Sequence, residues 1–377
     1  MQNTIYEYSE VEDEKFKNYI ISTPSLHKYF KLTWQKLRSK HYCGVINFAE
    51  KDYYLLPKIS KKDKESNLDI FIYMLMKAYD IKIQNEDIAS CKNNANNILE
   101  VFIQMFALKL FREFTRGTYK EYVTKQNNLN TLRGKYLINE NLKHNFTNEK
   151  IYCQYDEFSQ DNTLNQFFLF AVKTLLRYTK NKKLLKQCEL VLDEVSLKSF
   201  DINALHVEFN RLNARYKESY EFALLLLSKS IPLFAQGKKS FAFLFNMNEL
   251  FENFIGKIYE DIDSSTKVQN QKDFNNLRLK PDIITSEIII DTKYKKVKSK
   301  GDLNPADKYQ MFVYGTNFEK RNTMLLYPLH VQSVCENLVL GEGENMVDLK
   351  MRSIDLEFSG GYDEFINEIT KRLEILR

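Results

Sequence analysis

The chain has 377 residues and a formal net charge of +5 at neutral pH, which allows nucleic-acid binding without requiring it. This length is enough for two or three domains, and the longest apolar run, residues 222–234, is too short to span a bilayer. The five cysteines lack the paired spacing of zinc ligands, and the sequence has no Gly-x-x-x-x-Gly-Lys-Ser/Thr phosphate loop. These features exclude a zinc finger and a self-sufficient nucleotide hydrolase. Without a signal peptide, the chain is expected to be cytoplasmic, with reduced thiols.

The first 150 residues are predicted to mix strands with one long helix over residues 98–123. Its apolar side chains, such as Val101, Phe102 and Met105, are expected to pack in the protein core rather than to form a binding surface. Residues 126–145 are rich in asparagine and predict a loop with a short strand, in which Gly134 provides a tight turn.

Two further helices are predicted before the region of greatest chemical interest. They cover residues 164–179 and 218–234, and residues 237–240, Gly-Lys-Lys-Ser, are the candidate joint after them.

A fourth helix is predicted over residues 246–259, with apolar residues at helical spacing. Asn246 or Asn248 is a candidate cap. Glu249 and Glu252 lie three residues apart on one face, and the sequence leaves open which of them serves a site.

A hairpin is predicted next. The unbroken β-branched run 288–290 indicates a strand buried on both faces, and residues 277–285 predict its partner. Because strand side chains alternate, Asp291 and Lys293 share one face, and the hairpin brings Asp282 toward Asp291. Two carboxylates and one ammonium are therefore expected around a common point.

This grouping suits a Mg²⁺ site, because Mg²⁺ is a hard ion held by one or two carboxylates, water and substrate phosphate; Mn²⁺ is an alternative. Lys293 is then expected to orient a water molecule or to stabilise charge that develops on a phosphate. The alternative is an ordinary salt bridge of Asp291 with Lys293 or Lys295 at a strand end.

Another capped helix and a short strand follow. Residues 304–314 predict a helix with Pro305 in its first turn, and Gln310 and Tyr314 point the same way, four residues apart. Residues 323–328 predict an apolar strand. The order is helix, strand, strand, helix, strand.

This order resembles the PD-(D/E)xK nuclease superfamily, with Glu252, the Pro281-Asp282 pair and Asp291-Thr-Lys293 at the positions of its core motif. Gln310 and Tyr314 resemble the Gln-x-x-x-Tyr element of the RecB-like branch. The resemblance implies an α+β or α/β fold whose C-terminal part is a restriction-endonuclease-like core.

Several segments more closely resemble the McrC family, the nuclease subunits of McrBC modification-dependent restriction systems. The similar segments lie in both halves of the chain, in the same order as in the family: residues 43–48, 53–59, 132–135, 153–165, 248–252, 278–282, 290–295 and 307–310. The first two resemble early β segments of the family.

The McrC resemblance implies an N-terminal domain over residues 1–150 that contacts McrB, a GTP-hydrolysing AAA+ motor that reads modified cytosine in double-stranded DNA. Residues 151–377 are then a helical segment and the endonuclease domain, with the nuclease motifs within 246–328. The resemblance assigns catalysis to Asp282, Asp291, Lys293, Glu252 and Gln310, and a Mg²⁺ ion to Asp282, Asp291 and Glu252.

Basic residues trail directly from this motif. Lys295, Lys296 and Lys298, together with Tyr314, are candidate DNA contacts, although such a run is also typical of a solvated strand end. Arg133 and Lys135 are the candidate contacts to the motor protein.

Three functions remain open from the sequence. The first is a Mg²⁺-dependent endonuclease subunit driven by a GTPase partner. The second is an adaptor that activates the motor and carries an inactive nuclease core. The third is a stand-alone RecB-like repair nuclease.

Overall fold

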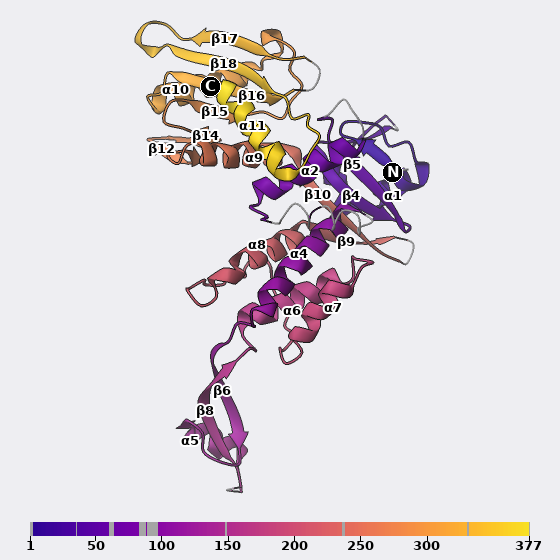
Figure 1. Cartoon of the computed structure of the whole chain (residues 1–377), viewed down its shortest axis with the longest axis vertical. Coiled ribbons are helices and arrows are strands. Elements are labelled where there is room, and N and C mark those ends of the chain that lie inside the picture. Colours follow the sequence, from indigo (N-terminus) through magenta and orange to yellow (C-terminus); the bar gives the residue numbers. More distant parts are fainter. Residues whose placement is uncertain are drawn as a thin grey trace. The chain divides into compact units, whose positions relative to one another are not determined.

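The computed structural model describes residues 3–34, 36–59, 64–82, 88, 97–147, 149–235, 238–329 and 332–376. The chain forms two compact units: residues 1–89 with 229–377, and residues 90–228, which are inserted between them in sequence. The fold is mixed α+β, as predicted (Figure 1). No helix in these described ranges has the length and hydropathy needed to cross a membrane.

The larger unit contains a five-stranded sheet in the order β1-β5-β4-β10-β9. Only the β1–β5 pair is parallel. The strands are β1 (Thr4–Tyr6), β4 (Tyr42–Phe48), β5 (Lys51–Leu56), β9 (Ser230–Ala235) and β10 (Lys238–Asn246). The two early strands expected at 43–48 and 53–59 are therefore confirmed, although the second ends at Leu56.

Short helices and a hairpin accompany this sheet. Asp13 caps α1 (Glu14–Ser22), and Phe16 of this helix stacks on Tyr53 of β5. After α1 come η1 (Pro24–Tyr29), β2 (Phe30–Thr33), β3 (Lys36–Ser39) and, beyond β5, α2 (Lys64–Ala78).

A six-stranded sheet in the larger unit has the order β11-β14-β15-β16-β18-β17. Its strands are β11 (Lys267–Val268), β14 (Ile283–Ile284), β15 (Ile289–Thr292), β16 (Asn322–Pro328), β17 (Cys335–Leu340) and β18 (Val347–Ile354). Strands β15, β16 and β18 run parallel. The predicted hairpin is confirmed, because β14 pairs antiparallel with β15.

The first strand of that hairpin is shorter than predicted. Within the expected strand 277–285, β13 (Leu277–Leu279) pairs instead with β12 (Lys272–Phe274) in a separate ribbon. Pro281, which cannot donate a ladder hydrogen bond, lies in the break between β13 and β14.

Three helices contact the six-stranded sheet, namely α9 (Met247–Ile262), α10 (Pro305–Asn317) and α11 (Tyr362–Leu376). Asn246 caps α9, and Asn304 caps α10 with Pro305 in the first turn, so both helix starts are confirmed. Helix α9 also packs against α2, and thus links the two sheets of this unit (Figure 1). Single 3-10 turns, η3 (Lys300–Asp302) and η4 (Gly343–Asn345), complete the elements here.

The smaller unit combines helices with a three-stranded sheet of order β6-β8-β7. Its elements are α4 (Ile98–Thr115), β6 (Glu121–Leu129), β7 (Lys135–Tyr136), α5 (Ile138–His144), β8 (Ile151–Ser159), α6 (Thr163–Leu175), α7 (Lys183–Val191), η2 (Ala214–Tyr216) and α8 (Lys217–Lys229). Helices α4, α6 and α8 share a core through aromatic contacts, such as that between Phe106 and Phe222.

Three predictions in this part of the chain are confirmed only in part, because two helices end earlier than predicted and the loop with a short strand contains further elements. The helix predicted over 98–123 ends at Thr115, because Gly117 adopts φ +102° and the next residues enter β6. The predicted loop 126–145 contains the end of β6, all of β7 and α5, although Gly134 does make a turn, with φ +66°. The helix predicted over 218–234 ends at Lys229, and β9 follows at once.

The two compact units do not follow the division expected at residue 150. That position lies inside the small sheet, where Ile151 of β8 pairs with Leu129 of β6. Of the candidate joint 237–240, Gly237 lies outside the described residues, and Lys238–Asn246 form strand β10.

Candidate active site

Strands β14 and β15 bring Asp282 and Asp291 to neighbouring positions. Ile283 pairs with Ile290, so Asp282 stands one residue before this pair and Asp291 one residue after it. The Thr292 amide and hydroxyl both donate to Asp282 Oδ2, at 2.7 and 2.9 Å. These two bonds fix the orientation of the Asp282 carboxylate.

Asp291 is almost completely buried, with 1% of its surface exposed. Lys293, on the same face of the chain, forms an ion pair with Asp291 Oδ2. Gln310 Nε2 donates to Asp291 Oδ1 at 3.3 Å. Strand β15, the residue after it and helix α10 thus bring Asp291, Lys293 and Gln310 together.

Glu252 reaches the same cluster from helix α9. Burial, followed by the negative charge of Asp282, raises the pKa of Glu252 to about 7; the charge of Asp291 acts in the same direction. Burial and then the charge of Asp282 also raise the pKa of Asp291 to about 7, against the opposing effect of Lys293. Glu252 and Asp291, whose ionisation is opposed by burial and by neighbouring negative charge, therefore share one location with Asp282.

The structure also distinguishes the two glutamates of helix α9. Glu249 Oε1 accepts a hydrogen bond of 3.0 Å from Asn246, the residue that caps the helix. Glu252, one turn further along, is the one whose charge interacts with Asp282 and Asp291.

The donor set fits a hard divalent cation. Besides the ion pair with Lys293, no hydrogen bond from the described residues reaches the buried Asp291 Oδ2. A cation would relieve the mutual repulsion that raises the two carboxyl pKa values. As the side chains stand, no group of three or more acidic, histidine or cysteine residues within the described ranges is arranged to hold a metal ion. Mg²⁺ is commonly held by one or two carboxylates and several waters.

The predicted Gln310 and Tyr314 pair is present on helix α10. Gln310 Nε2 donates to the Tyr314 hydroxyl at 2.8 Å, and this hydroxyl donates to the Lys280 carbonyl at 3.1 Å. Tyr314 is buried, so its hydroxyl ties α10 to the chain just before Asp282. This position does not favour the DNA contact that the sequence suggested.

The basic residues after β15 differ in their surroundings. Lys295 Nζ is 2.8 Å from Asp307 Oδ2, so its charge is already paired. Lys296 and Lys298 are exposed. Their contact with DNA phosphate stays a prediction.

Sequence reasoning missed two residues at this site. The backbone N–H of Gln269 donates to the Asp282 carbonyl at 2.7 Å. Its side-chain nitrogen donates to Glu252 Oε1, and its side-chain oxygen accepts a 2.8 Å bond from Lys280 Nζ. Gln269 lies in a polar segment without a periodic signal. Asp307 was visible within the matched segment 307–310, but its pairing with Lys295 depends on tertiary structure.

Arg133 and Lys135 belong to the other compact unit. The Arg133 guanidinium lies 4.1 Å from the centre of the Tyr155 ring and 3.6 Å from Glu157 Oε1. Lys135, in β7, is exposed.

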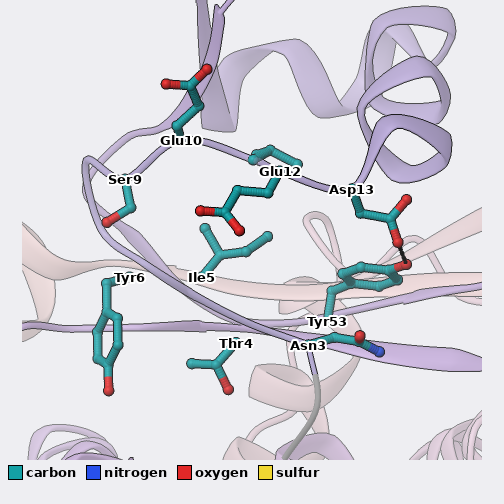
Figure 2. A pocket seen from close by; sticks show the side chains of 10 residues that line it. Asn3, Thr4, Ile5, Tyr6, Ser9, Glu10, Glu12, Asp13 and Tyr53 are labelled. Carbon is teal, nitrogen blue, oxygen red and sulfur yellow. Dashed lines mark hydrogen bonds between the residues drawn. The ribbon is translucent and has the colours of Figure 1, made fainter.

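A separate hollow of about 340 Å³ lies in the N-terminal part of the larger unit (Figure 2). Its lining includes Glu10, Glu12 and Asp13, and Figure 2 shows the hydrogen bond from Tyr53 to Asp13, 2.7 Å long. None of the predicted site residues lines it. Its acidic lining disfavours DNA phosphate.

The fold and site define an α+β protein with an acidic cluster and a lysine where a β-hairpin meets two helices. A family model described as "McrBC 5-methylcytosine restriction system component" matches residues 37–328, and the chain belongs to this family. No curated protein matches the chain.

Two solved structures from Thermococcus gammatolerans are similar. A chain in a refined half-complex from a tetradecameric assembly of McrB AAA+ hexamers with bound McrC has a TM-score of 0.68 and 22% identity, and the match covers 99% of both chains. A chain in the McrBC complex solved by cryo-electron microscopy has a TM-score of 0.51 and 26% identity, over 68% of this chain and 86% of that one. At 22% identity, the similarity to the chain of the half-complex is evidence for the fold alone.

Proposed function

We propose that this protein is the Mg²⁺-dependent DNA endonuclease subunit of a McrBC-type restriction system, with a nuclease core of the PD-(D/E)xK type. The observation that carries the proposal is the convergence of Asp282, Asp291, Glu252 and Lys293, with two carboxyl pKa values raised by burial and mutual repulsion. Perturbed carboxyl groups clustered in this way are typical of functional sites.

Asp282, Asp291 and Glu252 would hold the metal ion, which when bound would polarise the scissile phosphate and lower the pKa of a water molecule. Lys293, held by Asp291, places an ammonium where negative charge would develop on the phosphate. Gln310 keeps Asp291 in place through its 3.3 Å hydrogen bond. Lys296 and Lys298 would contact the DNA backbone, which makes binding sensitive to salt.

The proposed partner is a GTP-hydrolysing AAA+ oligomer similar to McrB, which would recognise double-stranded DNA carrying modified cytosine. Family membership supports this proposal, as does the likeness to a chain from an assembly of McrB hexamers with bound McrC and to a chain from a McrBC complex. The small sheet of the inserted unit, with α5, adds a structural reason because it exposes many apolar side chains. They are Tyr122, Leu132, Tyr136, Ile138, Leu142, Phe146 and Phe158. Arg133 and Lys135 lie in the same region and are proposed to contact the partner.

The test is cleavage of methylated and unmethylated plasmid by the chain and its partner with Mg²⁺ and GTP. Asp291→Ala is expected to abolish cleavage while leaving partner binding and GTPase stimulation intact. Asp273→Ala is the matched control, because Asp273 is exposed and pairs with Arg278 in the β12–β13 ribbon.

Each other outcome would contradict a different part of the proposal. GTP-independent cutting by the chain alone would point to a stand-alone nuclease. GTPase stimulation without any cutting would point to an adaptor. Loss of partner binding in Asp291→Ala would mean that this residue is structural.

A further inference from the structure

Glu7 is a buried carboxyl group that the proposed mechanism does not use. It follows strand β1 and has no exposed surface. Its amide N–H donates to the Leu56 carbonyl at 3.0 Å, which fixes its backbone to strand β5. A fully buried carboxyl group destabilises a protein unless it is hydrogen-bonded or paired, so its partners are informative.

Those partners lead to the candidate active site. Glu7 Oε1 accepts one hydrogen bond of 3.0 Å from the Lys58 amide and another of 3.0 Å from the Tyr294 hydroxyl. Glu7 Oε2 is buried, and no group among the described residues donates to it. Tyr294 is the residue directly after Lys293, and its ring packs 5.9 Å from that of Phe251 on helix α9.

Strand β15 ends at Thr292, and the segment that follows begins at Lys293. The Lys293 amide still donates to the Leu326 carbonyl at 2.9 Å, and the Lys295 amide turns back to the Lys293 carbonyl at 2.8 Å. The two residues after Lys293 are anchored through their side chains: Tyr294 to Glu7, and Lys295 to Asp307. The backbone at Lys293 is therefore held by its own bond to Leu326 and by these two side-chain bonds directly after it.

We propose that Glu7 is a positioning residue for the nuclease reaction: by holding the Tyr294 hydroxyl, it fixes the chain at Lys293 and so keeps the ammonium beside Asp291. This inference rests on the proposed function. It assigns to the first residues of the chain a role in the geometry of a site formed almost 300 residues later. A small misplacement of a catalytic group lowers turnover strongly, by about 100-fold for 1 Å in strongly affected cases.

Burial also favours the protonated Tyr294 hydroxyl that this hydrogen bond requires. It raises the pKa of Glu7 and that of Tyr294, so the phenol remains a donor at neutral pH. The amide oxygen of a glutamine at position 7 could accept the same two bonds. The acceptor oxygen, rather than the charge, is therefore the feature required.

The test compares Tyr294→Phe, Glu7→Leu, Glu7→Gln and the control Tyr53→Phe in the full chain with its GTPase partner. Tyr53 also donates to a carboxylate, Asp13, at 2.7 Å, in the same unit, and its ring contacts Phe16 and Phe48. Tyr294→Phe is expected to lower kcat for DNA cleavage about tenfold, with KM and GTPase stimulation within about twofold of wild type. Glu7→Leu, which removes the acceptor, is expected to lower kcat by a similar factor, whereas Glu7→Gln, which keeps the acceptor, and Tyr53→Phe are expected to retain wild-type kcat.

Hydrogen exchange of the peptide covering residues 289–296 supplies a readout that does not depend on cleavage. Tyr294→Phe is expected to exchange there about fivefold faster, as for the loss of one ordinary hydrogen bond, while Tyr53→Phe leaves this peptide unchanged. Unchanged exchange and kcat in Tyr294→Phe would overturn the inference, and so would an equal loss of kcat in Tyr53→Phe. If the wild-type protein does not cut, the proposed function fails, and exchange alone decides whether Glu7 anchors the segment.

Discussion

Gln269 restrains two of the three carboxylate residues at once. Its backbone N–H binds the Asp282 carbonyl, and its side-chain amide donates to Glu252, where this bond lowers the pKa that burial raises. The backbone of Gln269 has φ +49°, which is uncommon for residues other than glycine and asparagine. These contacts therefore help to hold it in place. Gln269 is therefore expected to control how readily Glu252 becomes an ionised ligand.

Gln269→Met keeps the length of the side chain and removes its donor and acceptor. We predict that the Mg²⁺ concentration for half-maximal cleavage rises about tenfold, because a hydrogen bond to a charged group contributes about 1.5–3 kcal/mol. Without the donor, the pKa of Glu252 rises further, so protons compete better with the metal ion. The deficit should therefore be larger at pH 6.5 than at pH 8.5.

Gln271→Met, at an exposed position two residues away, is the matched control and should leave the Mg²⁺ requirement unchanged. A pH-independent loss of rate at saturating Mg²⁺ would contradict the role given to Gln269.

Single residues differ in how far the sequence reveals them. Asp282, Asp291 and Lys293 could be placed together from strand alternation and a short link, because their neighbours are local. Glu252 could not be separated from Glu249, since both lie on one helical face and only the contact with Asp282 distinguishes them. Glu7 gave no signal, because its partner Tyr294 is distant in sequence.

At the scale of elements, helix α9 lies against strand β11 at a glycine. A Cβ atom on Gly256 would stand 2.9 Å from Val268 Cγ1 and 3.2 Å from Cγ2. Valine is stiff at χ1, so it does not yield easily. Val268 precedes Gln269, and the close approach therefore helps Gln269 to reach Glu252.

Gly256→Ala should push β11 away from α9. Overpacking of this kind has a cost of about 1–3 kcal/mol, so we predict that the Mg²⁺ requirement for cleavage rises about fivefold or more. The intrinsic preference of a helix for alanine, about 1 kcal/mol, favours folding but does not restore the spacing. A Mg²⁺ titration of cleavage measures the effect.

Gly256→Ala combined with Val268→Ala supplies the rescue, because it removes the methyl groups that the new Cβ would meet. The double variant should return toward the wild-type Mg²⁺ requirement. An equal defect in both variants would show that the spacing between α9 and β11 is not the cause.

Elements with a local sequence signal, such as a helix cap or an apolar run, were predictable, and elements without one were not. Asn246 and Asn304 marked the starts of α9 and α10, and the β-branched run marked β15. Strand β6 has exposed or half-exposed residues throughout, so no apolar alternation separated it from the preceding helix. Its pairing with β8 determines its conformation, and this pairing is a tertiary property.

At the scale of the whole molecule, the inserted unit interrupts the larger one, so the two proposed tasks fall on different parts of the chain. The carboxylate cluster is formed within the larger unit, whereas the small sheet with its exposed apolar residues lies within 90–228. Partner binding and metal binding should therefore be separable by mutation.

The small sheet can be removed at a natural junction. Glu121 of β6 lies opposite Ser159 of β8, so a two-residue Asn-Gly turn can replace residues 122–158. We predict that the shortened chain folds with an unfolding midpoint within a few degrees of wild type and still binds Mg²⁺ or Mn²⁺ by calorimetry, but no longer binds the GTPase partner. The exposed apolar surface is lost with the sheet, whereas the contacts of Asp282, Asp291 and Glu252 remain.

A double substitution, Arg133→Ala with Lys135→Ala, tests the same small sheet in the full-length chain with a smaller change. Arg133 rests on Tyr155 and Glu157, and Lys135 is exposed, so the change should weaken partner binding without unfolding the sheet. Lys183→Ala with Lys186→Ala, at exposed positions on α7, is the control for loss of two positive charges. If the shortened chain still stimulated the GTPase, the partner would have to contact another surface. If only the lysine pair on α7 weakened binding, that surface would be the helical part of the inserted unit.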